Sequence, residues 1–177
     1  MSEMTGVKKV ELETFFTDTL PASGNRREFS TGAVRDMAGK GRCDLLPWGI
    51  IGDLIFDKEE PGWMFCSGMD LATHGEMLKE SITECLYAFN MITGSSTANS
   101  LLNVARHYEA GARKYSERNW EKGLPIVVFL DSAGRHFLKH IDGWDDEPHE
   151  QAIVWNLLGA LWTIDHRPDL IGAPYDL

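Results

Sequence analysis

Residues 148–164 constrain the fold most, because their apolar side chains cover nearly every side of one predicted helix. A helix that is apolar all round is buried on most sides, so other elements must pack against it. One narrow stripe of this helix is different and consists of His149, Ala152, Asn156, Gly159 and Thr163. Its small residues allow a second helix to approach closely. His149 and Asn156 are polar, and each needs a partner when buried, since an unpaired polar group costs about 1–3 kcal/mol. A ligand, a metal ion or another side chain must supply that partner.

Helical periodicity in three further segments predicts a mainly α chain. Apolar residues fall on one side of a helix over residues 98–115, and a helix is predicted from about Asp70 to Met91. Pro125 favours the start of another helix, which ends near Gly143. The one β-branched run leads directly into helical periodicity, and strands do not alternate with helices. A helical bundle is therefore the expected fold.

The remaining segments are predicted to be an arm and loops. Residues 1–30 are polar and lack periodicity, which predicts a flexible, irregular N-terminal arm before a single helical domain over residues 31–177. Residues 31–49 predict a loop that enters a helix with Pro47 near its first turn. Residues 57–69 are typical of another loop.

Charge and composition exclude several classes of protein. A chain of 177 residues has the length of one domain. Its net charge of −10 argues against a nucleic-acid polymer as partner, but allows a phosphorylated ligand held through divalent cations. No apolar run approaches the roughly 20 residues that a membrane span needs, and no secretory signal is found. The three widely spaced cysteines are typical of free thiols, so we expect a cytoplasmic protein.

Glu109 lies at the edge of the apolar stripe of residues 98–115, with Arg106 and Arg113 about one turn away on either side. One interpretation is a row of surface ion pairs, which contributes little to stability. The other makes Glu109 a metal ligand or a general base that faces a cleft. The pattern alone does not choose between them.

Polar residues also mark the helix that follows Pro125. Asp131 and Arg135 lie on the side opposite its apolar face, whereas His136 lies at the margin of that face. His136 is either a hydrogen-bonded structural residue or a group that reaches a cleft. The segment WDDEPHE adds Asp145 and Asp146 at the start of the next helix.

Carboxylates and histidines on neighbouring helices are suited to a Mg²⁺ or Mn²⁺ site, because such ions prefer oxygen ligands and neutralise phosphate oxygens. The candidate metal ligands are Glu109, Asp131, Asp145 and Asp146. Sequence motifs typical of P-loops, dinucleotide-binding folds, zinc proteases and serine hydrolases are absent from the sequence. The cysteines are not clustered, which argues against a zinc site built from them.

Three ordered blocks carry a family resemblance. They are REFSTGAVRDMAGKGRCDLLPWG (27–49), HYEAGARKYSERNWEKGLP (107–125) and FLDSAGRHFLKHIDGWDDEPHEQAIVWN (129–156). Together they resemble the phage and prophage family called the dATP/dGTP diphosphohydrolase N-terminal domain. Residues 50–98 match less well and are interpreted as a divergent or inserted segment.

The resemblance implies metal-dependent hydrolysis of a purine deoxynucleoside triphosphate to the monophosphate and pyrophosphate. It also implies a likeness to the all-α MazG-type nucleotide pyrophosphohydrolases, with a purine nucleotide as ligand and Mg²⁺ or Mn²⁺ as cofactor. The candidate catalytic residues are Glu109, Asp131, His136 and His149. The candidate substrate-binding residues are Arg35, Asp36, Lys40, Arg42, Asp44, Lys114, Tyr115, Asn119, Trp120, Arg135 and Asn156.

One departure from the MazG pattern leaves the activity open. MazG-type enzymes hold their metals with an E-x-x-E helix and an E-x-x-D helix, whereas His149 and Ala152 stand where such a pair is expected here. A nucleotide-binding protein of the same fold that sequesters its ligand without cleaving it is therefore the alternative. A structural or assembly protein is a third interpretation. The apolar surface of residues 148–164 further predicts a homo-oligomer.

Overall fold

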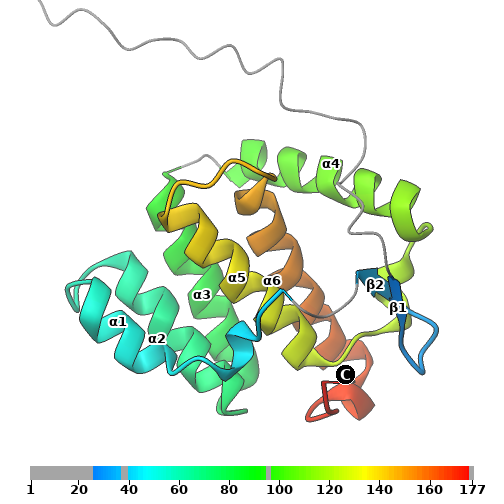
Figure 1. Cartoon of the computed structure of the whole chain (residues 1–177), viewed down its shortest axis with the longest axis horizontal. Helices are drawn as coiled ribbons and strands as arrows, with labels where there is room; N and C mark the ends of the chain where they lie inside the picture. The colour runs from blue at the N-terminus through cyan, green and yellow to red at the C-terminus, as the bar shows by residue number, and fades with distance from the viewer. Residues whose placement is uncertain (1–25, 37–39, 95–96, 176–177) are drawn as a thin grey trace, which may run out of the picture.

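The computed structural model describes residues 26–36, 40–94 and 97–175, and this part of the chain is mainly helical (Figure 1). The helices are α1 (Trp48–Ile55), α2 (Pro61–Thr73), α3 (Leu78–Thr93), α4 (Thr97–Tyr115), α5 (Ile126–Ile141) and α6 (His149–His166). Three short 3-10 turns accompany them, namely η1 (Cys43–Leu45), η2 (Asn119–Lys122) and η3 (Pro168–Leu170). The predicted mainly α fold class is confirmed. Most of the predicted N-terminal arm, residues 1–25, lies outside the described residues.

Prolines set the starts of four helices. Helices α1, α5 and α6 each begin directly after a proline, namely Pro47, Pro125 and Pro148, and Pro61 is the first residue of α2. Proline suits these positions because its fixed φ angle matches the helix and its missing N–H leaves no intrahelical bond unmade. The predictions based on Pro47, Pro125 and Pro148 are confirmed.

The segment between residues 57 and 91 differs from its prediction. A single helix was expected from Asp70 to Met91 after a loop over 57–69, but the chain forms α2 and α3 with a tight turn between them. Gly75 and Met77 adopt left-handed φ angles of 77° and 43° in this turn, which ends the first helix and reverses the chain. Because the sequence has helical periodicity on both sides of the turn, the pattern does not reveal that one helix ends and another begins there.

A small hairpin precedes the helices. Strand β1 (Arg26–Glu28) pairs antiparallel with β2 (Val34–Asp36), and Arg27 lies opposite Arg35. The Asn119 side chain extends this pairing, since it accepts a hydrogen bond from the Val34 amide at 2.9 Å and donates one to the Val34 carbonyl at 2.8 Å. The hairpin was not predicted, because its strands are short and one of its partners lies 85 residues away.

The core lies where α5 and α6 pack side by side at the centre of the fold (Figure 1). Helices α2 and α3 cover one side of this pair, and α4 crosses α6 on the other. Phe65 of α2 stacks on Phe137 of α5 with their ring centroids 3.9 Å apart. Gly159 of α6 allows α5 to come close, because a Cβ atom at this position would lie 2.5 Å from the Phe129 ring.

The narrow stripe predicted on residues 148–164 is buried against α5, as expected. His149, Ala152, Asn156 and Thr163 are each at most 4% exposed. Helices α3, α4 and α5 of the same chain all contact α6 and cover much of its apolar surface. The homo-oligomer therefore stays a prediction without support from this surface. No helix among the described residues is long and apolar enough to cross a membrane.

Candidate functional site

A cavity of about 550 Å³ lies between strand β2, helices α4, α5 and α6, and the C-terminal segment at Tyr175. Eleven of the residues singled out in the sequence line it: Arg35, Asp36, Lys40, Lys114, Tyr115, Asn119, Asp131, Arg135, His136, Asp146 and Asn156. These residues come from segments more than 100 positions apart. The fold therefore brings the three sequence blocks together around one space.

Arg35 projects from β2 into the buried side of this cavity. Its Nη2 donates a 2.6 Å hydrogen bond to Asn156 Oδ1, and its guanidinium lies over the rings of Phe129 and Trp155 at 5.6 and 5.4 Å. Burial, assisted by the nearby charge of Arg135, lowers the pKa of Arg35 to about 10. Its Nη1 atom is buried and has no hydrogen-bond partner among the described residues. A buried charged donor of this kind is costly unless an acceptor reaches it.

Asn156 and His149, the two polar residues of the buried α6 stripe that were singled out in the sequence, have partners within the chain. Asn156 Nδ2 donates to the Ala152 carbonyl at 2.7 Å, while its Oδ1 accepts from Arg35. His149 contacts His136 and Asp146. Buried side-chain atoms without a hydrogen-bond partner among the described residues include Arg35 Nη1 and His107 Nδ1, at the cavity, and Thr163 Oγ1, further along the α6 stripe.

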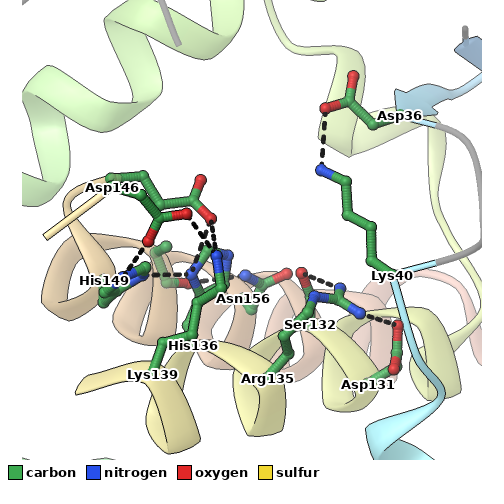
Figure 2. A network of polar contacts seen from close by, with 12 residues as sticks. Asp36, Lys40, Asp131, Ser132, Arg135, His136, Lys139, Asp146, His149 and Asn156 are labelled. Carbon is green, nitrogen blue, oxygen red and sulfur yellow. Dashed lines mark hydrogen bonds and ion pairs between the residues drawn. The ribbon is translucent and has the colours of Figure 1, made fainter. Parts of the chain in front are cut away.

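Asp36, the last residue of β2, joins this strand to the end of α4. Its carboxylate accepts hydrogen bonds from Lys114 Nζ at 2.9 Å and from Tyr115 Oη at 2.8 Å. Figure 2 shows its third contact, with Lys40 Nζ at 3.5 Å. Burial, the hydrogen bond to Asp36 and the charge of Asp36 raise the pKa of Tyr115, so its hydroxyl stays a donor. These contacts hold two ammonium groups at the cavity wall.

Asp131 of α5 is 1% exposed and holds the opposite wall. Its Oδ1 accepts a hydrogen bond from the Cys43 amide at 2.7 Å, and its Oδ2 accepts from Arg135 at 3.1 Å and from Tyr175 at 3.3 Å. Nearby, Arg42 makes a two-pronged ion pair and lies 3.7 Å over the Tyr175 ring. Its partner there, Asp44, is a predicted site residue that, like Arg42, does not line the cavity.

His136, which lines the cavity, lies in a histidine cluster with His149 (Figure 2). His136 Nδ1 lies 3.0 Å from His149 Nδ1 and 3.6 Å from Glu147 Oε1, and His149 Nε2 lies 3.0 Å from Asp146 Oδ1. Burial lowers the pKa of His136 to about 2, with His149 and Arg135 adding to the effect. Burial also lowers the pKa of His149, although Glu147 and Asp146 oppose it. Both imidazoles are therefore neutral at neutral pH.

The four carboxylates predicted as metal ligands are not brought together. Glu109 lies on the outer face of α4 with a side chain that is 61% exposed, and it pairs with Arg113 at 2.5 Å. Asp145 is exposed and does not line the cavity, whereas Asp131 and Asp146 do. Among the described residues, one group has the spacing that a metal ion requires, and it is the nitrogen-rich set of His136, Glu147 and His149. The structure thus gives no all-oxygen Mg²⁺ site at the predicted residues.

Trp120, proposed to stack on a base, lies instead in an aromatic cluster. Its ring centroid is 5.1 Å from that of Trp162 and 5.5 Å from that of Tyr108, and it does not line the cavity. The aromatic side chains that do line the cavity are Tyr115, Trp144, Trp155 and Tyr175.

Sequence reasoning missed several lining residues as site residues: Arg27, His107, Ser132, Lys139, Trp144, Glu147, Trp155 and Tyr175. Spacing could have found two of them. Lys139 continues a row on α5 that starts at Asp131, and His107 precedes Gly111 and Lys114 on one side of α4. Arg27 and Tyr175 reach the cavity only through tertiary packing, so their sequence neighbourhoods carry no signal.

The structure thus has an internal cavity lined by lysine and arginine side chains within a mainly helical domain. Residues 84–171 match the sequence model of the family described as dATP/dGTP diphosphohydrolase, N-terminal, and the chain belongs to this family over that segment. The matched segment includes α4, α5 and α6. It leaves out the hairpin with Arg35 and Asp36, for which the resemblance stays a prediction.

Neither a curated protein nor a solved structure matches the chain. The likeness to the MazG-type fold therefore stays a prediction as well.

Proposed function

We propose that the protein hydrolyses dATP or dGTP to the deoxynucleoside monophosphate and pyrophosphate, with a divalent cation, Mg²⁺ or Mn²⁺, as cofactor. A phage or prophage is the proposed setting. The family description supports the nucleotide and the reaction. The cavity supports the binding of a triphosphate.

The charge of the cavity carries this proposal. Six lysine and arginine side chains line it, against four carboxylates, although the whole chain has a net charge of −10: the six are Arg27, Arg35, Lys40, Lys114, Arg135 and Lys139. Cations gathered inside an acidic protein indicate a ligand with several negative charges. Arg35 adds a buried donor that a phosphate oxygen would satisfy.

The size and remaining walls of the cavity are suited to a nucleotide. A volume of about 550 Å³ lies within the range of sites that enclose small molecules. Trp155 and Trp144 bring aromatic side chains to the cavity for contact with a base, and Ser132 brings a hydroxyl group for a base or sugar.

The chemistry required is attack of water on the α-phosphorus, with cleavage of its bond to the bridging oxygen and departure of pyrophosphate. The transition state spreads negative charge over phosphate oxygens, which fixed guanidinium and ammonium groups stabilise. Arg35, Arg135 and Lys114 are held by Asn156, Asp131 and Asp36, so they are already oriented before substrate binds. A bound divalent cation would neutralise further phosphate charge and orient the water. The predicted carboxylates do not form a site for it, and we assign no step to them.

Turnover is the test. Purified protein would be incubated with dATP, dGTP, dCTP and dTTP, each with Mg²⁺ and with Mn²⁺, and the monophosphate and pyrophosphate measured. We expect both products from a purine substrate in equal amounts. An Arg35→Gln variant should lose most of the rate, whereas Glu80→Gln, on the exposed surface of α3, should keep it. Absence of turnover of all four nucleotides at high protein concentration with either metal would overturn the proposal.

A binding protein that holds a nucleotide intact is the second candidate. The observation in its favour is that two cavity carboxylates are already engaged, Asp36 by Lys114 and Tyr115, and Asp131 by Arg135 and the Cys43 amide. A carboxylate committed to such contacts is a poor acceptor for the proton of an attacking water. This candidate predicts tight binding without a metal and recovery of the uncleaved ligand after denaturation.

A further inference from the structure

We propose that His136, Glu147 and His149 form a binding site for one divalent ion of the first transition series, such as Mn²⁺, Fe²⁺, Co²⁺ or Zn²⁺. His136 projects from α5, His149 is the first residue of α6, and Glu147 lies in the connection between these helices. The four carboxylates predicted as metal ligands are not members of this cluster, although Asp146 contacts it through His149. Metal binding at this site does not depend on the proposed function, whereas a role of the metal in hydrolysis rests on it.

The distances within the cluster fit one shared ion. The three ligand atoms all lie within 4.8 Å of one another, and the two measured edges are 3.0 Å between the histidine Nδ1 atoms and 3.6 Å from His136 Nδ1 to Glu147 Oε1. Ligand bonds of about 2.1 Å place neighbouring ligand atoms roughly 3.0 Å apart in an octahedral shell and roughly 3.4 Å apart in a tetrahedral one. In the ion-free cluster His136 Nδ1 donates the hydrogen bond to His149 Nδ1, so an ion can contact all three atoms once the His136 proton moves to Nε2 and the side chains adjust.

Asp146 orients one of the ligands. Its Oδ1 lies 3.0 Å from His149 Nε2, so this nitrogen carries the proton and donates it to the carboxylate. The lone pair of His149 is then on Nδ1, the atom that faces the cluster (Figure 2). A carboxylate behind a histidine in this way fixes the ring and makes it a better metal ligand. Lys139 holds Asp146 in turn through a 2.6 Å ion pair.

The donor set selects the class of ion. Mg²⁺ and Ca²⁺ prefer oxygen ligands throughout, whereas imidazole nitrogens favour first-row transition metals, and two histidines with one carboxylate leave coordination positions open. His136 and Glu147 both line the cavity, so the open positions face the space assigned to the triphosphate. Lys139 Nζ lies 3.5 Å from Glu147 Oε1 and competes with the ion for it, so we expect moderate rather than very tight affinity.

Metal binding without nucleotide tests this site. The full chain, freed of any histidine tag and stripped with a chelator, would be titrated with Co²⁺ while its visible absorption is followed. Mn²⁺, Zn²⁺ and Mg²⁺ would be compared by calorimetry. We expect one equivalent of Co²⁺, Mn²⁺ or Zn²⁺ to bind, and Mg²⁺ to bind at least ten times more weakly.

Variants separate a metal site from a structural cluster. Glu147→Gln, which changes a half-buried residue in a connecting segment, should weaken Co²⁺ binding at least tenfold, and so should His149→Gln. Asp146→Asn should weaken it by about 10- to 100-fold, as expected for a residue that orients a ligand. His140→Gln removes a histidine one turn along α5 and should leave the affinity unchanged. Circular dichroism would verify that each variant is folded.

Failure of this inference differs from failure of the proposed function. Two results would overturn the metal site. One is that the wild-type chain binds none of these ions in stoichiometric amount, and the other is that the wild type and the Glu147→Gln variant bind Co²⁺ with equal affinity. Nucleotide turnover with Mg²⁺ alone would then still stand. A chain that binds Co²⁺ as expected but cleaves no nucleotide keeps the metal site and loses the proposed function.

Discussion

Two regions of the molecule differ in the side chains that they bury. One is formed by helices α1–α3, and the other by the hairpin, α4 and the facing sides of α5 and α6. Helices α2 and α3 contribute Phe65, Met69 and Ile82, and Ser81 is the one buried polar side chain found on α1–α3. On α5 and α6 the buried polar residues are Asp131, Ser132, His136, His149, Asn156 and Thr163. Burying polar groups opposes folding, so their concentration on one side indicates a site rather than a need of the fold. Apolar burial in the first region therefore stabilises the folded state, whereas polar burial in the second region reduces that stability.

The largest expected effect is on stability, from Phe65→Ala in the apolar region. Phe65 is fully buried and stacks on Phe137, so its truncation leaves a cavity and should lower the free energy of unfolding by about 3–5 kcal/mol. Chemical denaturation measures this loss, with Glu59→Gln, at an exposed position before α2, as the control. A loss below 1 kcal/mol would contradict the division between the two regions.

A smaller effect is expected from His107 in the polar region. Burial, assisted by the charge of Arg35, lowers the pKa of His107 from 6.5 to about 4. The folded state thus favours the neutral ring, and this contribution to stability is complete above pH 6.5 and is lost as the pH falls toward 4. The loss amounts to at most about 1.4 kcal/mol for each pH unit.

Replacement of His107 by Phe should make stability less dependent on pH in that interval. Denaturation curves of both proteins between pH 4 and pH 7.5 provide the measurement. Parallel curves for the two proteins would show that His107 does not titrate as described.

The fold could be predicted from sequence where the signal is local. Periodicity and prolines identified α4, α5 and α6, but the left-handed turn at Gly75–Met77 escaped because the residues on both sides remain helical in pattern. For the site, the sequence predicted many of the residues that line the cavity, but not which of them contact one another. Nothing local indicates that Arg35 meets Asn156 across 121 positions, or that Trp120 packs on Trp162 instead of facing the cavity.

The smallest effect is expected at Glu109, where the sequence prediction and the position in the structure differ most. Its side chain is exposed on the outer face of α4, and exposed ion pairs such as that with Arg113 contribute about 0–1 kcal/mol. Glu109→Gln should therefore change nucleotide turnover by less than twofold, as measured by pyrophosphate release. A loss of 100-fold or more would support the sequence prediction of a catalytic or metal-binding role and would place part of the site outside the cavity.

Equilibrium binding of a triphosphate that cannot be cleaved tests the central claim most directly, because cleaving and holding both require the cavity. Calorimetry would compare an α,β-methylene analogue of dATP or dGTP on the wild-type chain and on Arg35→Gln. We predict saturable binding of one molecule to the wild type. Binding should be about 10- to 100-fold weaker for the variant, since a hydrogen bond to a charged group contributes about 1.5–3 kcal/mol. Equal affinity in the two proteins, or no binding of either analogue to the wild type, would contradict the assignment of the cavity.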